Sequence, residues 1–204
     1  MTDYLIDGPK AARTVVLAHG AGAPMDSPFM ARVAQGLAAS GLRVVRFEFP
    51  YMAKRRTEGT RRGPDRASVL QETWSAVIAD LGDSARLVIG GKSMGGRIAS
   101  MIADAEDVAG WLCFSYPFHP AGRPQQTRTQ HLQALRTPSL ILQGTRDALG
   151  NRAEVETYDL SSSIRVFWLE DGDHDLKPRK ASGRTHDQNL DDAIAAAASF
   201  VKGL

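Results

Sequence analysis

The fold of the chain is decided by one stretch, Leu87-Val88-Ile89-Gly90-Gly91-Lys92-Ser93-Met94-Gly95-Gly96. Its first three residues form an all-apolar run, which is typical of a strand that is buried on both faces. Beyond the glycines, apolar side chains recur at the spacing of a helix face, at Met94, Ile98, Met101 and Ile102. The stretch therefore predicts a central strand, a tight turn with Ser93 at its apex, and a helix that runs to about residue 105.

The turn itself allows three interpretations. Gly91, Ser93 and Gly95 match the G-x-S-x-G pattern of a nucleophile elbow, a strained turn that exposes a serine hydroxyl. Glycine is needed at both flanking positions because a Cβ atom there would collide with a neighbouring strand or helix. The second interpretation is a phosphate-binding loop, although Arg86 stands where that motif has its first glycine. The third is a glycine-rich turn with a purely structural role.

Composition places the chain among ordinary globular proteins. It has 204 residues, 43% hydrophobic and 24% charged, which favours one domain spanning residues 1–204. The net charge of +2 indicates no particular charged partner. Cys113 is the only cysteine and lies in an apolar run, so we expect a buried thiol, no disulfide and no cysteine metal cluster. The chain has no signal-like start and no apolar run of about 18 residues, so we expect a cytoplasmic protein without a membrane segment.

Strand-like and helical patterns alternate along the whole chain. Apolar strand-like runs lie at residues 14–18, 42–49, 87–89, 108–115, 139–143 and 164–169. Helical patterns lie at 30–37, 69–81, 94–105 and 190–201, with shorter ones at 130–135 and 152–158, and Asp65 is placed to cap the second. Strands that are apolar on both faces are typical of a parallel sheet covered by helices. We therefore predict an α/β fold with a mostly parallel central sheet of about six or seven strands and helices on both faces.

Polar side chains suited to catalysis follow three of these strands. Ser93, Asp147 and His174 each come directly after an apolar run, in the order serine, acid, histidine. The carboxyl ends of parallel strands meet at one edge of a sheet, so the three should lie together. His174 would take the proton of Ser93, and Asp147 would orient the imidazole. Other acids compete for the last role, namely Asp171, Asp173 and Asp175 beside His174.

An oxyanion hole needs two backbone N–H groups near the serine. One should belong to Met94 and the other to the loop His19-Gly20-Ala21-Gly22, with Ala21 the preferred donor and Gly22 beside it. This loop has an alternative interpretation as a simple tight turn, in which His19 packs or bonds locally. Tyr116 and His119 are candidates for lining a substrate pocket, whereas His131 and His186 are expected on the surface or at helix starts.

The segment 51–64 is predicted to be a basic loop. It carries Lys54, Arg55, Arg56, Arg61 and Arg62, and it leaves from the same sheet edge as Ser93. One interpretation is a solvated loop. The other is that two or more arginines face the pocket and favour a substrate with a carboxylate or phosphate, which arginine can pair with bidentately. Nucleic acid is a weaker partner because the patch has no interleaved aromatic residues.

Taken together, these blocks resemble a known family. The chain is similar to small α/β-hydrolases without a lid, in the group that includes dienelactone-hydrolase relatives and the testis-expressed protein 30 type. The residues that carry this resemblance are His19–Gly22, Phe47–Met52, Gly90–Arg97, Tyr116–Pro120, Gln143–Asp147 and Gly172–Leu176. The resemblance implies a serine-hydrolase-type site, although the substrates of the group are poorly defined. From the residues and composition we expect a serine hydrolase acting on a small ester or thioester, with no metal or organic cofactor and no membrane or nucleic-acid partner.

Two features keep an alternative open. Some members of the group look like scaffolds, so a non-catalytic binding protein that retains the fold is the competing hypothesis. Lys92, directly before the serine, departs from the neutral residue that is common there. Its charge either favours an oxyanion or points into solvent. The sequence does not indicate an oligomeric state.

Overall fold

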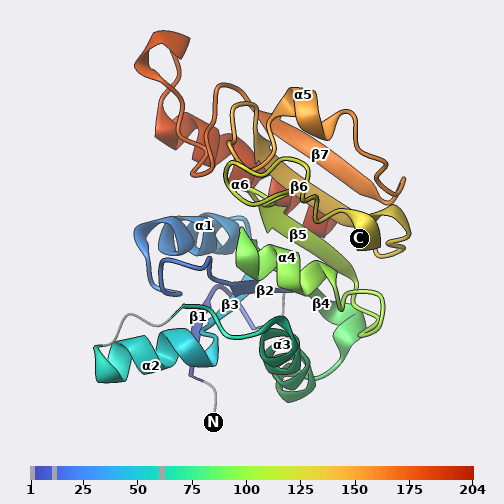
Figure 1. The fold of residues 1–204 in the computed structure, drawn as a ribbon. Coiled ribbons are helices and arrows are strands. Elements are labelled where there is room, and N and C mark those ends of the chain that lie inside the picture. Colours follow the sequence, from blue (N-terminus) through green and yellow to red (C-terminus); the bar gives the residue numbers. More distant parts are fainter. Residues whose placement is uncertain (1–2, 11–12, 60–62) are drawn as a thin grey trace.

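The structure is a computed structural model, and it describes residues 3–10, 13–59 and 63–204 (Figure 1). Its centre is a seven-stranded sheet with the order β1-β3-β2-β4-β5-β6-β7. The strands span Tyr4–Asp7 (β1), Thr14–Ala18 (β2), Arg43–Phe47 (β3), Leu87–Lys92 (β4), Gly110–Phe114 (β5), Ser139–Gly144 (β6) and Ile164–Leu169 (β7). All neighbouring pairs are parallel except β1 with β3. The predicted mostly parallel α/β sheet is confirmed, with β4 at its centre.

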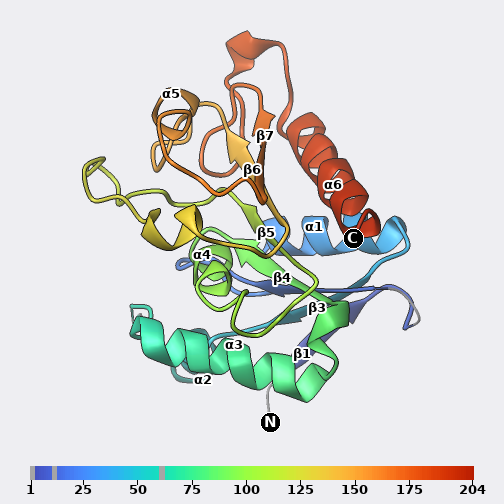
Figure 2. The ribbon, with the colours of Figure 1, turned by 90° about the vertical axis from the view of Figure 1, so that its right-hand side faces the viewer.

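Helices cover both faces of this sheet. One face packs against α1 (Pro28–Ala39) and α6 (His186–Lys202), and the other against α2 (Pro50–Glu58), α3 (Ala67–Leu81) and α4 (Met94–Ser100), as Figures 1 and 2 show. Successive residues of a strand point to opposite faces, so Val88 joins one hydrophobic core and Ile89 the other. Because both faces of the central strands are buried, the sequences of these strands are unbroken apolar runs.

The two long helices α3 and α6 illustrate how the sequence sets the packing. On α3, Leu70, Trp74 and Val77 are buried along one stripe, and Trp74 contacts Phe47 edge-on with ring centroids 4.7 Å apart. Helix α6 begins with a capping box at Thr185, an arrangement worth about 1 kcal/mol. Both helices thus lie where the apolar periodicity predicted them.

The predicted basic loop at 51–64 is wrong for most of its length, because residues 50–58 form α2. Pro50 occupies the first turn of that helix, where its missing N–H group costs nothing. Asp65 does not cap α3, which starts after Arg66 without a side-chain cap. Its carboxylate instead accepts the Tyr51 N–H of α2 at 3.0 Å. Arg61 and Arg62 lie outside the described residues.

Several element ends also differ from prediction. The edge strand β1 has no counterpart in the predicted pattern, and the strands predicted at 42–49 and 108–115 are shorter. Helix α4 ends at Ser100 rather than near residue 105, which leaves Met101 39% exposed. The remaining short elements are η1 (Ser84–Arg86), η2 (Gln130–Gln133), α5 (Arg152–Val155) and η3 (Lys180–Ser182). Apart from the additional elements β1 and α2, these differences concern boundaries and do not alter the order of the predicted elements.

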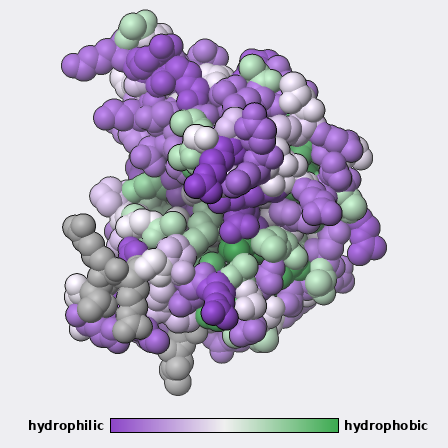
Figure 3. Space-filling view, in the orientation of Figure 1, coloured by the Kyte–Doolittle hydropathy of each residue, from purple (hydrophilic) through white to green (hydrophobic). Residues whose placement is uncertain are grey.

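The surface is largely polar. Figure 3 shows hydrophilic side chains over most of one face, with apolar ones gathered near the middle of the view. Among the described residues, the large hydrophobic side chains with substantial exposure are Ile6, Met101 and Phe167. A search of the described helices found none with the length and hydrophobicity needed to cross a membrane.

Candidate active site

Ser93 sits in a strained turn between β4 and α4. Its backbone angles are φ 50° and ψ −114°, a combination that costs a non-glycine residue about 1–3 kcal/mol. Hydrogen bonds hold it there, from the Ser93 N–H to the Phe114 carbonyl and from the Arg97 N–H to the Ser93 carbonyl, each 2.9 Å long. The backbone conformation is that of an elbow between strand and helix, as the glycine spacing predicted.

Gly91 and Gly95, which flank Ser93, leave no room for a side chain. A Cβ atom on Gly91 would lie 2.0 Å from the Ala18 carbonyl oxygen, and one on Gly95 would lie 2.5 Å from the same atom. Gly91 also has a φ of 152°, which side chains disfavour. Strand β2 therefore runs so close to the elbow that only glycine fits at either position.

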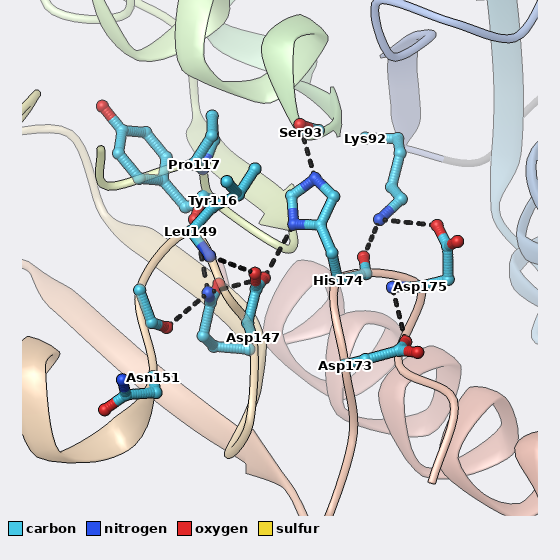
Figure 4. A network of polar contacts seen from close by, with 12 residues as sticks. Lys92, Ser93, Tyr116, Pro117, Asp147, Leu149, Asn151, Asp173, His174 and Asp175 are labelled. Carbon is cyan, nitrogen blue, oxygen red and sulfur yellow. Dashed lines mark hydrogen bonds and ion pairs between the residues drawn. The ribbon is translucent and has the colours of Figure 1, made fainter. Parts of the chain in front are cut away.

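Three residues from three loops meet at this edge of the sheet. The His174 ring places Nε2 2.8 Å from Ser93 Oγ and Nδ1 2.8 Å from Asp147 Oδ2 (Figure 4). Asp147 is fully buried, whereas the His174 side chain is 29% exposed. Nδ1 of the ring therefore donates to the Asp147 carboxylate, which leaves Nε2 free to accept the Ser93 hydroxyl proton.

Asp147 is held by further hydrogen bonds. The Leu149 N–H donates to Oδ1 at 2.8 Å, and the side-chain amide of Gln143 donates to Oδ2 at 3.0 Å (Figure 4). The same amide donates to the carbonyls of Gly150 at 3.0 Å and Tyr116 at 3.3 Å. Gln143 was not predicted as a site residue. The available signal was a polar side chain at the end of the apolar run 139–143, four residues before the acid.

The competing acids have other partners. Asp171 pairs with Arg179 and Arg146, and the hydrogen bond from the Arg179 side chain lowers the pKa of this carboxyl group to about 2. Asp173 accepts the N–H group of Asp175 at 2.9 Å (Figure 4). It also accepts the N–H group of Lys177 at 2.9 Å, and the two hydrogen bonds shape the loop. Of these described carboxylates, Asp147 is the one that contacts the His174 ring.

Lys92 points at the His174 loop and not into solvent. Its ammonium group donates to the His174 carbonyl and lies 3.4 Å from Asp175 Oδ1 (Figure 4). It also lies 5.0 Å from the centre of the Phe29 ring. The residue is buried, and this burial lowers the pKa of its ammonium group. The alternative of a solvated Lys92 is therefore wrong, because the side chain ties the end of β4 to the loop that carries His174.

The loop after β2 is also held by side chains. The backbone N–H of Phe49 donates to Nε2 of His19 at 3.1 Å, so Nδ1 carries the proton and donates to the Gly20 carbonyl at 2.7 Å. Burial lowers the pKa of His19, which favours this neutral form. The Tyr51 hydroxyl donates to the Ala21 carbonyl at 3.0 Å. The local bonding expected for His19 is confirmed.

Two cavities flank Ser93. One, of about 440 Å³, extends toward α3 and the loop 117–128, and the other, of about 380 Å³, lies between the loop 20–23 and the start of α1. Ala21, Ser93 and Leu149 line both, Met94 lines the first and Gly22 the second. A further hollow of about 700 Å³, between the starts of β6 and β7 and the end of α6, lies at the opposite edge of the sheet.

Tyr116 and His119, predicted to line a pocket, are not among the described residues that line either cavity. Tyr116 is fully buried, and its hydroxyl donates to the Arg128 carbonyl at 2.8 Å. His119 is buried with its ring nitrogens 2.9 Å from the Pro120 carbonyl and 3.3 Å from the Glu154 carboxylate. The Tyr116 ring packs edge-on against Trp111 and Phe118 in the hydrophobic core.

His131 lies near the start of the 3₁₀ helix η2, as expected, and is partly buried with Nε2 2.8 Å from the Ser100 hydroxyl. His186 occupies the first turn of α6 as expected. Cys113 is buried, as predicted, and burial raises the pKa of its thiol. In the described ranges, no three histidine, cysteine or acidic side chains are grouped so that they could hold a metal ion.

Comparison with known proteins adds to this geometry. A protein-family model described as an alpha/beta hydrolase domain matches residues 11–202. A solved alpha-beta serine hydrolase homologue from Coxiella burnetii superposes with a TM-score of 0.72 at 20% identity, covering 100% of this chain and 91% of that one. A serine hydrolase without a lid from Xanthomonas campestris gives 0.68 at 20% identity, covering 98% and 88%.

A third likeness is to Est1E from Butyrivibrio proteoclasticus, whose structure has ferulic acid bound. It superposes with a TM-score of 0.73 at 14% identity, covering 99% of this chain and 94% of that one. At these identities the superpositions establish a shared fold.

Proposed function

The chain belongs to the alpha/beta hydrolase family, and from this membership we propose that it is a serine hydrolase that cleaves a small ester or thioester. The observation that carries the proposal is the hydrogen-bonded series from Ser93 through His174 to the buried carboxylate of Asp147, with both distances at 2.8 Å. A serine hydroxyl needs a base within such reach to become a nucleophile, and the base needs a group that orients it.

In the proposed first half-reaction, Ser93 Oγ attacks the substrate carbonyl and His174 Nε2 takes the hydroxyl proton. Asp147 keeps the proton of the ring on Nδ1 and stabilises the imidazolium that forms. His174 then gives the proton to the leaving alcohol or thiol, which departs and leaves an acyl-enzyme on Ser93. In the second half-reaction, water attacks the acyl group while His174 takes a proton from the water. The bond between the acyl carbon and Ser93 Oγ then breaks, His174 returns the proton to Oγ, and the carboxylic acid leaves.

The oxyanion that forms at each attack needs two donors. We assign these to the backbone N–H groups of Met94, next to the nucleophile, and Ala21, which lines both cavities beside Ser93. The Ala21 loop is bonded through its carbonyls to His19 and Tyr51, and this support would limit its movement during the reaction. The two cavities, of about 440 and 380 Å³, suit compact acyl and leaving groups better than an extended peptide.

The proposal is tested with a fluorophosphonate probe, which reacts with activated serines. We expect one equivalent of label per chain, located on Ser93 by peptide mass spectrometry, and no labelling of heat-unfolded protein. An inert Ser93 in folded protein would instead favour the non-catalytic binding protein, because the hydroxyl would then lack the activation that His174 should supply.

Replacing Tyr51 with phenylalanine is expected to lower kcat about 10-fold, while KM changes little. The hydroxyl donates to the Ala21 carbonyl, so its loss should loosen one oxyanion donor without removing it, and complete removal of such a donor costs about 10²–10³-fold. Steady-state hydrolysis of a 4-nitrophenyl ester measures the change. Tyr158→Phe removes a hydroxyl from a partly buried tyrosine elsewhere and serves as the control. An unchanged kcat in Tyr51→Phe would contradict the role assigned to Ala21.

A further inference from the structure

Two arginine side chains line the larger cavity beside Ser93. Arg97 comes from α4, four residues after Ser93, and Arg128 comes from the loop between β5 and β6. Resting on the hydrolase function proposed above, we propose that this cavity of about 440 Å³, here called the arginine cavity, binds a carboxylate carried by the substrate. The substrate class is then an ester with a free carboxylate on its acyl or its alcohol part.

Neither guanidinium has a carboxylate partner in the described part of the chain. Arg97 contacts the Met101 sulfur at 3.8 Å, and its buried Nε has no hydrogen-bond partner among the described residues. Arg128 makes one long contact, 3.5 Å, to the Pro117 carbonyl. The buried Arg46, by contrast, pairs with Asp7 at 2.9 Å. Two half-buried cations without a counter-ion are costly, and an anion would offset this cost.

The pKa of the Arg128 guanidinium is consistent with a partly buried cation that has no carboxylate partner among the described residues. Burial lowers the pKa of its guanidinium, and the nearby charge of Arg97 lowers it further. The two cations therefore lie close enough to repel one another. Planar guanidinium groups that converge on one cavity match the geometry of a carboxylate, which accepts several N–H groups at once.

The loop that carries Arg128 is held firmly. Its backbone N–H donates to the Phe118 carbonyl at 2.7 Å, and its carbonyl accepts the Tyr116 hydroxyl at 2.8 Å. Arg97 is held by its place in α4, where its N–H donates to the Ser93 carbonyl. Both guanidinium groups thus start from backbone positions fixed relative to the nucleophile, which is what a binding site needs.

One acidic side chain, Asp65, lines the same cavity. Its Oδ2 atom accepts the Tyr51 N–H at 3.0 Å, so it is engaged at the start of α2. Among the described lining residues, the charged side chains are Asp65, Arg97 and Arg128, and their sum is positive. The cavity on the other side of Ser93 differs, because its charges, Lys92 and Asp175, pair with one another.

Of the basic residues that the sequence placed near the pocket, Lys54, Arg55 and Arg56 lie in the described part of the chain, and none of these three lines the arginine cavity. Arg56 pairs with Glu48 at 2.6 Å and with Asp26 at 2.9 Å, and the Arg55 guanidinium lies 5.2 Å from the centre of the Tyr51 ring. Among the described residues, the arginines that line this cavity are therefore Arg97 and Arg128, and not Arg55 or Arg56.

The test compares ester pairs that differ in one carboxylate. Mono-4-nitrophenyl adipate and 4-nitrophenyl hexanoate carry the difference on the acyl part, and 4-acetoxybenzoate and phenyl acetate carry it on the alcohol part. We expect Arg97→Gln and Arg128→Gln each to lower kcat/KM for the anionic member of at least one pair by about 10- to 100-fold, the scale of a lost charged hydrogen bond. The neutral member should change by less than about 3-fold. Arg123→Gln, on an exposed arginine of the same loop, is the matched control for general charge effects.

The outcomes separate this inference from the proposed function. If neutral esters are hydrolysed and Ser93 is labelled, but both variants affect both members of both pairs equally, the arginine cavity does not bind the carboxylate. If no ester is hydrolysed, adipate binding to Ser93→Ala protein is measured by calorimetry. Adipate binding that weakens about 10-fold or more when Arg97→Gln or Arg128→Gln is added to Ser93→Ala would show that the cavity binds a carboxylate even in a protein that is not a catalyst. No adipate binding would overturn the inference.

Discussion

Ser93→Ala is expected to lower kcat for ester hydrolysis by on the order of 10⁶-fold, the loss seen when the nucleophile of such a hydrogen-bonded triad is removed. The reason is chemical, since alanine offers no oxygen to form the acyl-enzyme and leaves His174 with nothing to deprotonate. The fold should persist, because the substituted alanine keeps the same Cβ in the same strained turn. Residual hydrolysis is measured at high enzyme concentration with a 4-nitrophenyl ester, and thermal unfolding checks stability.

The control for this variant is Ser199→Ala, on the exposed face of α6, which should retain full activity. Retention of more than about 1% of kcat in folded Ser93→Ala protein would mean that the nucleophile lies elsewhere, because the remaining donors and cavities are not expected to supply that much catalysis.

Asp147→Asn is expected to lower kcat by about 10⁴-fold, the scale of losing the correct imidazole tautomer. Asp147 accepts three hydrogen bonds, from Leu149 N–H on Oδ1 and from Gln143 and His174 on Oδ2. Asparagine has one acceptor oxygen, so either orientation sets its NH₂ group against a donor. If the amide oxygen bonds Leu149, the NH₂ group faces His174 Nδ1 and forces the proton to Nε2. His174 then cannot accept the proton of Ser93.

The same clash predicts some loss of stability, because a buried donor left without an acceptor costs about 1–3 kcal/mol. Thermal unfolding and kcat are therefore measured together, at a temperature where the variant is folded. Asp173→Asn is the matched control on the histidine loop, since asparagine keeps the oxygen that accepts the Asp175 and Lys177 N–H groups. Full activity of Asp147→Asn would show that another group orients His174.

The segment at 50–58 shows where prediction from sequence fails. Its buried residues are Tyr51 and Met52, so it lacks the long apolar stripe that identifies α3 and α6. The helix is supported by distant partners instead. Asp65 accepts the Tyr51 N–H, and Arg56 pairs with Asp26 and Glu48. The strand β1 is a similar case, because four residues gain their order by pairing with β3 and through the ion pair of Asp7 with Arg46.

The elbow was predictable from sequence because its constraints are local. Positions 91 and 95 must be glycine because the backbone at Ala18 passes close to them. This constraint is visible in the five-residue motif 91–95 of the sequence. The alternation of apolar runs likewise determines a parallel sheet, and strand ends determine which loops share an edge. Ser93, Asp147 and His174 could therefore be named as neighbours before any distance was known.

The tertiary structure alone decided what surrounds those three residues. Spacing along the chain does not say that Gln143 bonds Asp147, that Lys92 turns toward the His174 carbonyl, or that Tyr116 and His119 are buried. Nor does it say that Arg97 and Arg128 share a cavity while Arg56 is paired elsewhere. The direction of a long side chain depends on the partners that packing brings within about 3 Å, and those partners come from elements far apart in the sequence.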